Sequence, residues 1–206
     1  MLVLGLTGKA CAGKNQYARV FESFGCKTVD VDRLGHEALQ ANTQELVRVF
    51  GPSVVNAEGV DRKALGSLVF SDPQKLRQLE AITHPSMVEA CKALIGEAKK
   101  QGAAAIVLNA ALLERMGLAL LCDHVLFIRS PFLIRFLRCR KREGLTIRKF
   151  YKREQMQKDI KPSSLQKQTK VTIFTNTRSL SVIHRQIATY CGTIGIDVTA
   201  TQQNEG

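Results

Sequence analysis

Runs of apolar residues that do not alternate with polar ones recur along this chain. They occupy residues 2–7, 103–108, 124–128 and 171–174. Unalternating apolar runs of this length are typical of strands that are covered on both faces of a parallel sheet. Residues 26–30, which follow a glycine, predict one more strand.

Helical patterns lie between these strands. Residues 14–24 predict a helix that ends before Gly25, and residues 33–50 and 72–101 are mostly helical. Strands that alternate with helices are typical of an α/β doubly wound sheet. Because residues 32–102 are too many for a simple crossover between strands, we expect them to form a helical insertion.

The composition fits a chain that folds without covalent or metal supports. Of its 206 residues, 45% are hydrophobic, which is enough to bury the core of one domain with an insertion. The six cysteines form no Cys-x-x-Cys pair and no cluster with histidine at zinc spacing, so we expect ordinary reduced thiols. The apolar start lacks a basic leader, and no later segment reaches the roughly 18 apolar residues of a membrane span. We therefore expect a cytoplasmic protein.

The formal net charge of +12 belongs to one segment. Residues 129–170 carry 14 Lys and Arg against three acidic residues, whereas the rest of the chain is nearly balanced, with 16 against 15. A local excess of positive charge fits a polyanion, either a nucleic acid or the phosphates of a nucleotide. A solvated basic face explains the same composition equally well.

The most informative motif directly follows the first apolar run. Residues 8–14 read Gly-Lys-Ala-Cys-Ala-Gly-Lys, which matches the GxxxxGK phosphate-binding pattern between a strand and a helix. In such a loop, successive backbone N–H groups surround a phosphate, and Lys14 adds a positive charge for the outer phosphates. Asn15 stands where the pattern has Ser or Thr, whose hydroxyl holds Mg²⁺. The predicted nucleotide-binding residues are Gly8, Lys9, Ala10, Cys11, Ala12, Gly13, Lys14, Asn15 and Gln16.

Two carboxylates lie at the end of the second predicted strand. Asp30 and Asp32 flank Val31, so strand alternation directs both to the same side. At the carboxyl edge of a parallel sheet, such a carboxylate can orient a hydroxyl, accept its proton or hold a metal-bound water. The alternative is that Asp32 caps the N-terminus of the next helix.

Further motifs occur in an order typical of one family. They are Gly5-Leu6-Thr7-Gly8, Asp30-Val31-Asp32 with His36, residues 58–65 around Arg62, Leu79-Glu80-Ala81-Ile82-Thr83-His84-Pro85, Leu112-Leu113-Glu114, Arg138 with Arg142 and Gln155, and Asn176. On these residues the chain resembles the dephospho-CoA kinase family, P-loop enzymes similar to nucleoside monophosphate kinases. The resemblance covers nearly the whole chain.

The resemblance implies a fold and an activity. The fold is one P-loop NTPase domain over residues 1–206, with a five-stranded parallel sheet flanked by helices. Its parts are a core at about 1–31, 103–134 and 168–200, a helical substrate-binding insertion at about 32–102 and a basic lid at about 135–167. The activity is transfer of the ATP γ-phosphate to the ribose 3′-hydroxyl of dephospho-CoA, the last step of coenzyme A biosynthesis, with Mg²⁺. The implied partners are ATP and dephospho-CoA, with no nucleic acid or membrane, in a monomer or weak oligomer.

The resemblance also implies roles for individual residues. Asp32 would accept the proton of the 3′-hydroxyl, and Lys14, Arg138 and Arg142 would stabilise charge on the transferred phosphoryl group. Asn15 would contact the metal. The residues implied for dephospho-CoA are Asp32, His36, Arg62, His84, Leu112 and Glu114.

Several of these residues have plain alternatives. Arg62 can be a surface cation, and His84 can cap or brace a helix before Pro85. Arg138 and Arg142 are four residues apart and can line a solvated helix face.

The chain departs from the family pattern on the ATP side. Two loop glycines of the family are Lys9 and Cys11 here, and side chains at these positions restrict φ and crowd the loop. The other departures are Asn15 for a hydroxyl residue, Ala111 for a proline, Tyr151 for an arginine four residues before Gln155, and Thr177-Arg178 for a glycine after Asn176. An alternative is therefore a divergent nucleotide- or CoA-binding protein with weak or no transferase activity. An ATP-driven nucleic-acid-binding protein has less support, because no aromatic-basic pattern of the RNA-recognition kind is present.

Overall fold

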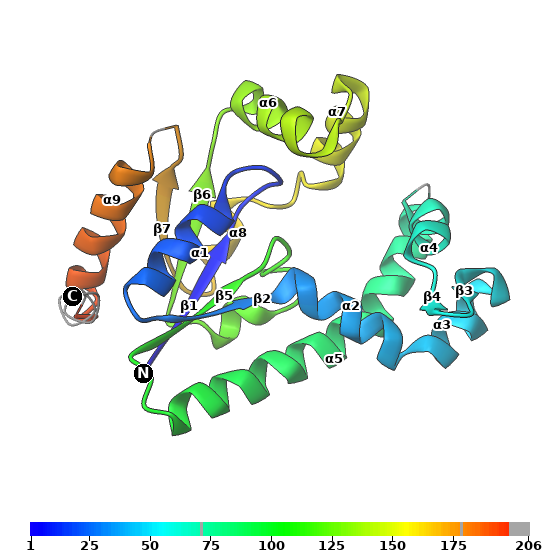
Figure 1. Cartoon of the computed structure of the whole chain (residues 1–206), viewed down its shortest axis with the longest axis horizontal. Helices are drawn as coiled ribbons and strands as arrows, with labels where there is room; N and C mark the ends of the chain where they lie inside the picture. The colour runs from blue at the N-terminus through cyan, green and yellow to red at the C-terminus, as the bar shows by residue number, and fades with distance from the viewer. Residues whose placement is uncertain (71, 178, 198–206) are drawn as a thin grey trace. The chain divides into compact units, whose positions relative to one another are not determined.

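Parallel strands form the main sheet of the structure, a computed structural model that describes residues 1–70, 72–177 and 179–197 (Figure 1). The described residues form a five-stranded sheet in the order β2-β5-β1-β6-β7, and its pairings are parallel. The strands are β1 (Leu2–Thr7), β2 (Lys27–Asp30), β5 (Ala105–Asn109), β6 (His124–Arg129) and β7 (Lys170–Thr175). The predicted α/β fold class is confirmed. Arg178 and residues 198–200, which the sequence predictions include, lie outside the described residues.

The contacts of the chain divide it into two compact units. One is Met1–Asp30 with Ile95–Gly206, and the other is Val31–Leu94. The five-stranded sheet belongs to the first unit. Asp32, which follows the end of β2 by two residues, belongs to the second.

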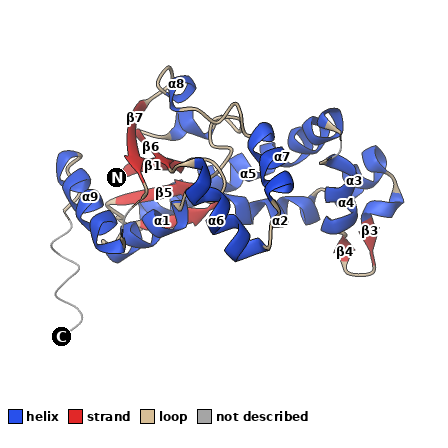
Figure 2. Cartoon of the chain, turned by 90° about the horizontal axis from the view of Figure 1, so that it is seen from above, coloured by secondary structure: helices blue, strands red, loops and turns tan. Residues whose placement is uncertain are grey.

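Side-chain alternation along β1 builds the core of the first unit. Leu4 and Leu6 are fully buried on one face of the sheet, in one apolar cluster with Phe21 and Ile187. Phe21 lies on α1 (Lys14–Ser23) and Ile187 on α9 (Leu180–Thr193), two helices that contact each other (Figure 2). Burying a side chain of this size contributes about 1.5–3 kcal/mol, so this layer fixes the loop that joins β1 to α1.

The edge strand β7 corrects one expectation. The apolar run at residues 171–174 predicts a strand buried on both faces, but β7 is the last strand of the sheet and Ile173 is 40% exposed. An apolar run does not distinguish a central strand from an edge strand, because only the pairing order decides which faces are covered. The runs that became β1, β5 and β6 are buried as predicted.

The basic stretch of the first unit folds into helices. They are α6 (Phe132–Glu143), α7 (Ile147–Met156) and the short α8 (Pro162–Leu165), and a 3₁₀ helix, η2 (Leu118–Leu121), precedes β6. Gly144, in the left-handed region at φ +64°, ends α6, and the Thr146 hydroxyl caps α7. Phe150 of α7 is buried against Phe132 and Phe136 of α6, so the two helices share an aromatic contact.

The second unit is mainly helical. Its elements are α2 (Val31–Ala41), α3 (Thr43–Phe50), the 3₁₀ helix η1 (Pro52–Val54), the hairpin strands β3 (Val55–Asn56) and β4 (Gly59–Val60), α4 (Arg62–Val69) and α5 (Pro73–Lys100), whose end reaches into the first unit. Leu46, Val54 and Leu65 lie in its apolar core. The sequence predicts α2, α3 and α5 but not α4 or the hairpin. Among the described residues, no helix has both the length and the apolarity to cross a membrane.

Two capping alternatives from the sequence are wrong. Helix α2 begins at Val31, directly after β2, so Asp32 lies in the first helical turn rather than at the capping position. Helix α5 continues through Pro85 to Lys100, so His84 lies within a helix and does not cap its end. A proline costs a helix one backbone hydrogen bond, and buried Met87 and Cys91 on the following turns keep α5 packed beyond it.

Candidate active site

Two glycines give the phosphate loop its shape. Gly8 has φ +145° and Gly13 has φ +96°, backbone conformations that L side chains rarely adopt. A Cβ on Gly8 would lie 2.3 Å from the Ile128 carbonyl oxygen, and one on Gly13 would lie 2.1 Å from Asn176 Nδ2. Both positions therefore require glycine. Helix α1 begins at Lys14, so its N-terminal amides and positive dipole end face the loop.

Lys14 folds across this loop. Its Nζ donates to the Gly8 carbonyl oxygen at 3.1 Å, and its side chain is half-buried. The predicted phosphate-binding lysine thus lies over the loop that it would serve.

A buried asparagine and a lid arginine hold the far side of the loop. Asn176 is 1% exposed, and its Nδ2 donates to the Ala12 carbonyl oxygen at 2.9 Å and to Gln16 Oε1 at 3.1 Å. Arg138 of α6 donates to the same Ala12 oxygen at 3.3 Å and to Asn176 Oδ1 at 3.4 Å. Arg138 therefore lies at the loop, not on a solvated face.

Arg142 has different contacts. It is exposed, and its Nε donates to Glu143 at 2.9 Å. Arg153 of α7 also binds Glu143, at 2.8 Å. Burial acts to raise the pKa of Glu143, but hydrogen bonds from the two arginines outweigh it and leave that pKa below its ordinary value. Of the two predicted lid arginines, the structure places Arg138 against the loop and Arg142 in this ion-pair group.

Lys9, which replaces a glycine of the family pattern, forms an ion pair with Glu154 of α7. Arg135 of α6 binds the other oxygen of Glu154 at 2.7 Å. Burial acts to raise the pKa of Glu154, but hydrogen bonds from Arg135 and Lys9 hold it below its ordinary value. The next loop residue, Ala10, donates its backbone N–H to Gln157 Oε1 at 2.9 Å. The loop is thus tied to α7 and to the turn that follows it.

The expectation of reduced cysteines is wrong for two of the six. Cys11 and Cys139 form a disulfide with a Cα–Cα distance of 5.8 Å across 128 residues of sequence. Cys11 has φ +59°, the left-handed region that glycine occupies most readily. Sequence spacing gave no signal for this pair, because the packing of α6 against the loop brings the two residues together. The remaining cysteines, Cys26, Cys91, Cys122 and Cys191, are free and buried.

Asn15 contacts a buried asparagine at the end of β5. Asn109 Nδ2 donates to Asn15 Oδ1 at 3.0 Å. Asn109 is 5% exposed, and its Oδ1 has no hydrogen-bond partner among the described residues. Asp30, the last residue of β2, is in register with Asn109 in the parallel sheet. Oxygen-bearing side chains therefore gather where the loop meets the carboxyl ends of two strands.

The predicted acceptor-side residues are divided between the units. In the second unit, Arg62 of α4 contacts His36 of α2, with 2.7 Å between Nη1 and Nε2. Asp32 lies exposed in the first turn of α2, and His84 is half-buried on α5. In the first unit, Leu112 and Glu114 follow β5, and Glu114 accepts a hydrogen bond from Ser164 of α8. The structure thus pairs His36 with Arg62 and Glu114 with Ser164.

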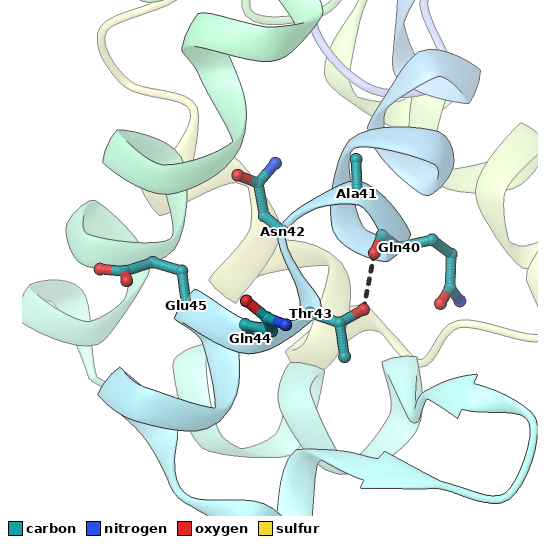
Figure 3. A pocket seen from close by; sticks show the side chains of 6 residues that line it. All are labelled: Gln40, Ala41, Asn42, Thr43, Gln44 and Glu45. Atoms are coloured by element: carbon teal, nitrogen blue, oxygen red, sulfur yellow. Dashed lines mark hydrogen bonds between the residues drawn. The ribbon is translucent and has the colours of Figure 1, made fainter.

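A surface pocket of the second unit is lined by other residues. Its lining residues are Gln40, Ala41, Asn42, Thr43, Gln44 and Glu45, at the turn between α2 and α3 (Figure 3). The Thr43 hydroxyl donates to the Gln40 carbonyl oxygen at 2.6 Å and closes this turn. None of the predicted site residues lines the pocket.

Sequence reasoning missed the residues outside the loop that bind the loop residues or their partners. These residues are Arg135, Glu154, Gln157 and, from β5, Asn109. One signal was present for Gln157. The family pattern places an arginine four residues before a glutamine, and Arg153 and Gln157 keep that spacing two residues beyond Tyr151 and Gln155.

Comparison with known proteins identifies the family. A family model described as dephospho-CoA kinase matches residues 2–179. The chain belongs to the dephospho-CoA kinase family. A dephospho-CoA kinase from Geobacter metallireducens is 36% identical over 149 residues, which cover 70% of this chain and 74% of the relative.

Solved structures share the fold of this chain. A Thermus thermophilus crystal structure aligns with a TM-score of 0.75 at 30% identity and covers 94% of this chain and 97% of its own. A dephospho-CoA kinase from Campylobacter jejuni shares the fold, with a TM-score of 0.67 at 24% identity over 93% and 96% of the two chains. Membership of the dephospho-CoA kinase family confirms the predicted class, an ATP-dependent kinase of CoA biosynthesis.

Proposed function

We propose that this chain transfers the γ-phosphate of ATP to the ribose 3′-hydroxyl of dephospho-CoA. The observation that carries the proposal is the phosphate loop, in which Gly8 and Gly13 permit a turn that only glycine fits and Lys14 lies across it. Family membership supplies the acceptor, because relatives of this chain bear the name dephospho-CoA kinase.

The residues of this chain divide the work between donor and acceptor. The amides of residues 8–16 bind the donor phosphates, and Lys14 and Arg138 spread positive charge over the transferred group. Arg142 joins them when α6 approaches bound nucleotide. Asp32 accepts the proton of the 3′-hydroxyl as that oxygen attacks. The position of Asp32 supports this role, because it follows by two residues the end of β2, where Asp30 is in register with Asn109.

The site carries ligands that suit Mg²⁺. Hard divalent cations prefer carboxylate and amide oxygens, and Asn15, Asn109 and Asp30 provide them. The buried Asn109 Oδ1 with no partner among the described residues fits such an ion better than it fits an apolar core. These three residues would hold the metal, which neutralises charge on the donor phosphates. Because Asn15 replaces a hydroxyl, its longer side chain would contact the ion directly or through water.

The remaining predicted residues form the acceptor side. The His36 and Arg62 pair presents cationic and hydrogen-bonding groups to a phosphorylated acceptor, and His84, Leu112 and Glu114 complete the proposed binding set. We also propose a cytoplasmic monomer or weak oligomer whose basic lid serves nucleotide phosphates, not a nucleic acid or a membrane. Two arginines of the basic stretch, Arg135 and Arg153, form ion pairs with glutamates of the same stretch. These pairs reduce the positive charge that the stretch could offer to a nucleic-acid backbone or a membrane surface.

One specific observation favours a second candidate, a nucleotide-binding protein with weak transfer. The loop amide of Ala10 and the side chains of Lys9 and Asn15 are all engaged by Gln157, Glu154 and Asn109. Phosphates would have to displace some of these contacts. If they do not, ATP binds without productive transfer.

A coupled assay separates the two candidates. Purified protein with ATP and Mg²⁺ is expected to release ADP only when dephospho-CoA is present, and to stop when the divalent cation is chelated. Calorimetric titrations with each ligand provide the control for binding. Binding of both ligands without turnover above background would reject the transferase and favour the second candidate.

Asn15→Ser is expected to keep or raise kcat and to lower the Mg²⁺ concentration that gives half-maximal rate. The reason is that a serine hydroxyl reaches the metal position that the phosphate-loop pattern uses. Mg²⁺ titrations of kcat in the two proteins measure the shift. Arg19→Ala, which changes an exposed side chain of α1 outside the proposed binding set, is the control for general damage to this region. A clear loss of kcat in Asn15→Ser alone would mean that the loop has been rebuilt around asparagine.

A further inference from the structure

Four consecutive residues of the phosphate loop are bonded to the lid segment, which is defined here as residues 132–157. The pairs are Lys9 with Glu154, Ala10 with Gln157, Cys11 with Cys139, and Ala12 with Arg138. Three of these links are non-covalent, so bound phosphate can compete for them. The disulfide cannot be displaced by a ligand. As long as the disulfide is intact, it fixes the loop to α6 throughout the kinase cycle.

The disulfide lies inside the contact between loop and lid. Cys139 is fully buried and Cys11 is 9% exposed, and both pack with Phe150 in one small apolar cluster. A lid that opens and closes around its nucleotide moves relative to the loop, and such motions often set kcat. A covalent link at this point opposes that motion. Reduction would leave two thiols in the same cluster and free α6 to move.

Three of the free cysteines are poor candidates for thiol exchange. Burial raises the pKa of Cys26 and of Cys91 to about 11, and that of Cys191 to about 12. At neutral pH these thiols stay protonated, whereas the thiolate is the reactive form. Disulfides of cytosolic proteins are usually transient and serve catalysis or redox sensing. The Cys11–Cys139 pair, by contrast, is already joined in the structure, so reduction and reoxidation of this bond need no rearrangement of the fold.

A metal site is the competing use of the same residues. Ligand atoms of Cys11, Cys139 and Glu143 lie within 4.8 Å of one another. The Glu143 carboxylate, however, is bound by Arg142 and Arg153. Two guanidinium groups beside the third ligand repel a divalent cation. The charges therefore favour a dithiol–disulfide pair.

We propose that Cys11 and Cys139 form a thiol–disulfide modification site that controls the kinase by locking the phosphate loop to the lid. A dithiol reductant restores activity: its thiolate attacks one sulfur and breaks the Cys11–Cys139 bond. Its second thiol then releases the mixed disulfide. The products are two cysteine thiols and one oxidised reductant, a transfer of two electrons and two protons. The proposal rests on the transferase activity proposed above.

The test compares the oxidised and reduced full chain. Protein treated with oxidised glutathione, then freed of it, is expected to have kcat lowered on the order of tenfold, and dithiothreitol is expected to restore it. Peptide mass spectrometry after alkylation confirms whether Cys11 and Cys139 are joined. Cys139→Ser is expected to have the kcat of the reduced protein, and treatment with oxidised glutathione is expected to leave that kcat unchanged. Cys191→Ala, which changes an equally buried cysteine, is expected to keep the redox response.

Two further measurements distinguish failure of the disulfide lock from failure of the proposed transferase activity. Amide hydrogen exchange of α6 and the Kd for ATP are measured in both states, so the lock has readouts that do not need turnover. Unequal exchange with no turnover in either state would support the lock and reject the transferase. Equal kcat, Kd and exchange in proteins shown to be oxidised and reduced would overturn the proposal. Retention of stoichiometric Zn²⁺ by reduced protein that resists oxidation would overturn it in favour of a metal site.

Discussion

Asp32→Asn is expected to lower kcat by about 10²–10⁴-fold, the range typical of removing a general acid or base. An amide of nearly the same shape cannot accept the proton of the attacking hydroxyl. Asp32 is exposed in the first turn of α2, where a negative charge stabilises a helix by only about 0.3–1 kcal/mol. Because this loss is small, the fold should tolerate the change. The Kd for ATP should be nearly unchanged, because the donor phosphates bind to residues of the other unit. Steady-state kinetics with dephospho-CoA and a calorimetric ATP titration measure the two effects.

The matched control for Asp32 is Glu37→Gln. Glu37 is an exposed acid on the same helix, so its replacement removes one negative charge without touching the proposed base. We expect kcat to stay within about twofold of the wild-type value, as for most exposed surface changes. An Asp32→Asn enzyme as active as the Glu37→Gln enzyme would remove the proposed role of Asp32.

Lys14→Ala is expected to lower kcat/KM by about 10²–10³-fold, comparable to the loss of one preorganised donor at a developing negative charge. The Lys14 side chain lies across the loop with its Nζ on the Gly8 carbonyl oxygen, so it is already in place before nucleotide arrives. Its loss should also weaken ATP binding, because phosphoryl oxygens lose their closest point charge. Kinetics at saturating dephospho-CoA with varied ATP separates the change in KM from that in kcat.

The control for Lys14 is Lys141→Ala, an exposed lysine on α6. It removes one positive charge from the basic lid while the loop stays intact. Urea denaturation of both variants checks that folding is preserved. If Lys14→Ala and Lys141→Ala lost activity equally, general charge rather than the loop lysine would account for catalysis.

The local geometry of the loop was accessible from sequence because it depends on neighbouring residues. Glycines at positions 8 and 13 and a lysine at 14, between an apolar run and a helical pattern, determine a turn that only glycine fits. The parallel five-stranded sheet followed from the same pattern, since parallel strands need helical crossovers, but the order of the strands within it did not. The boundary between β2 and α2 did not follow from the sequence, and Asp32 lies in the first turn of α2 rather than at the capping position that the alternative interpretation gave it.

The partners of the substituted loop residues were not accessible from sequence. Cys11 meets Cys139 across 128 residues, Lys9 meets Glu154 across 145, and Asn15 meets Asn109 across 94. Such pairs depend on which strands are neighbours and on how α6 and α7 pack, which no local pattern encodes. Read alone, Lys9, Cys11 and Asn15 looked like defects on the ATP side. In the structure, each of these side chains has a partner of matching chemistry.

The product of the reaction tests the account most directly. Purified protein is incubated with ATP, Mg²⁺ and dephospho-CoA, and the product is analysed by mass spectrometry and ³¹P NMR. We predict one added phosphate per ADP formed, present as a monoester on the ribose 3′-oxygen. ADP formed without a phosphorylated acceptor, or phosphate on another oxygen, would contradict the account.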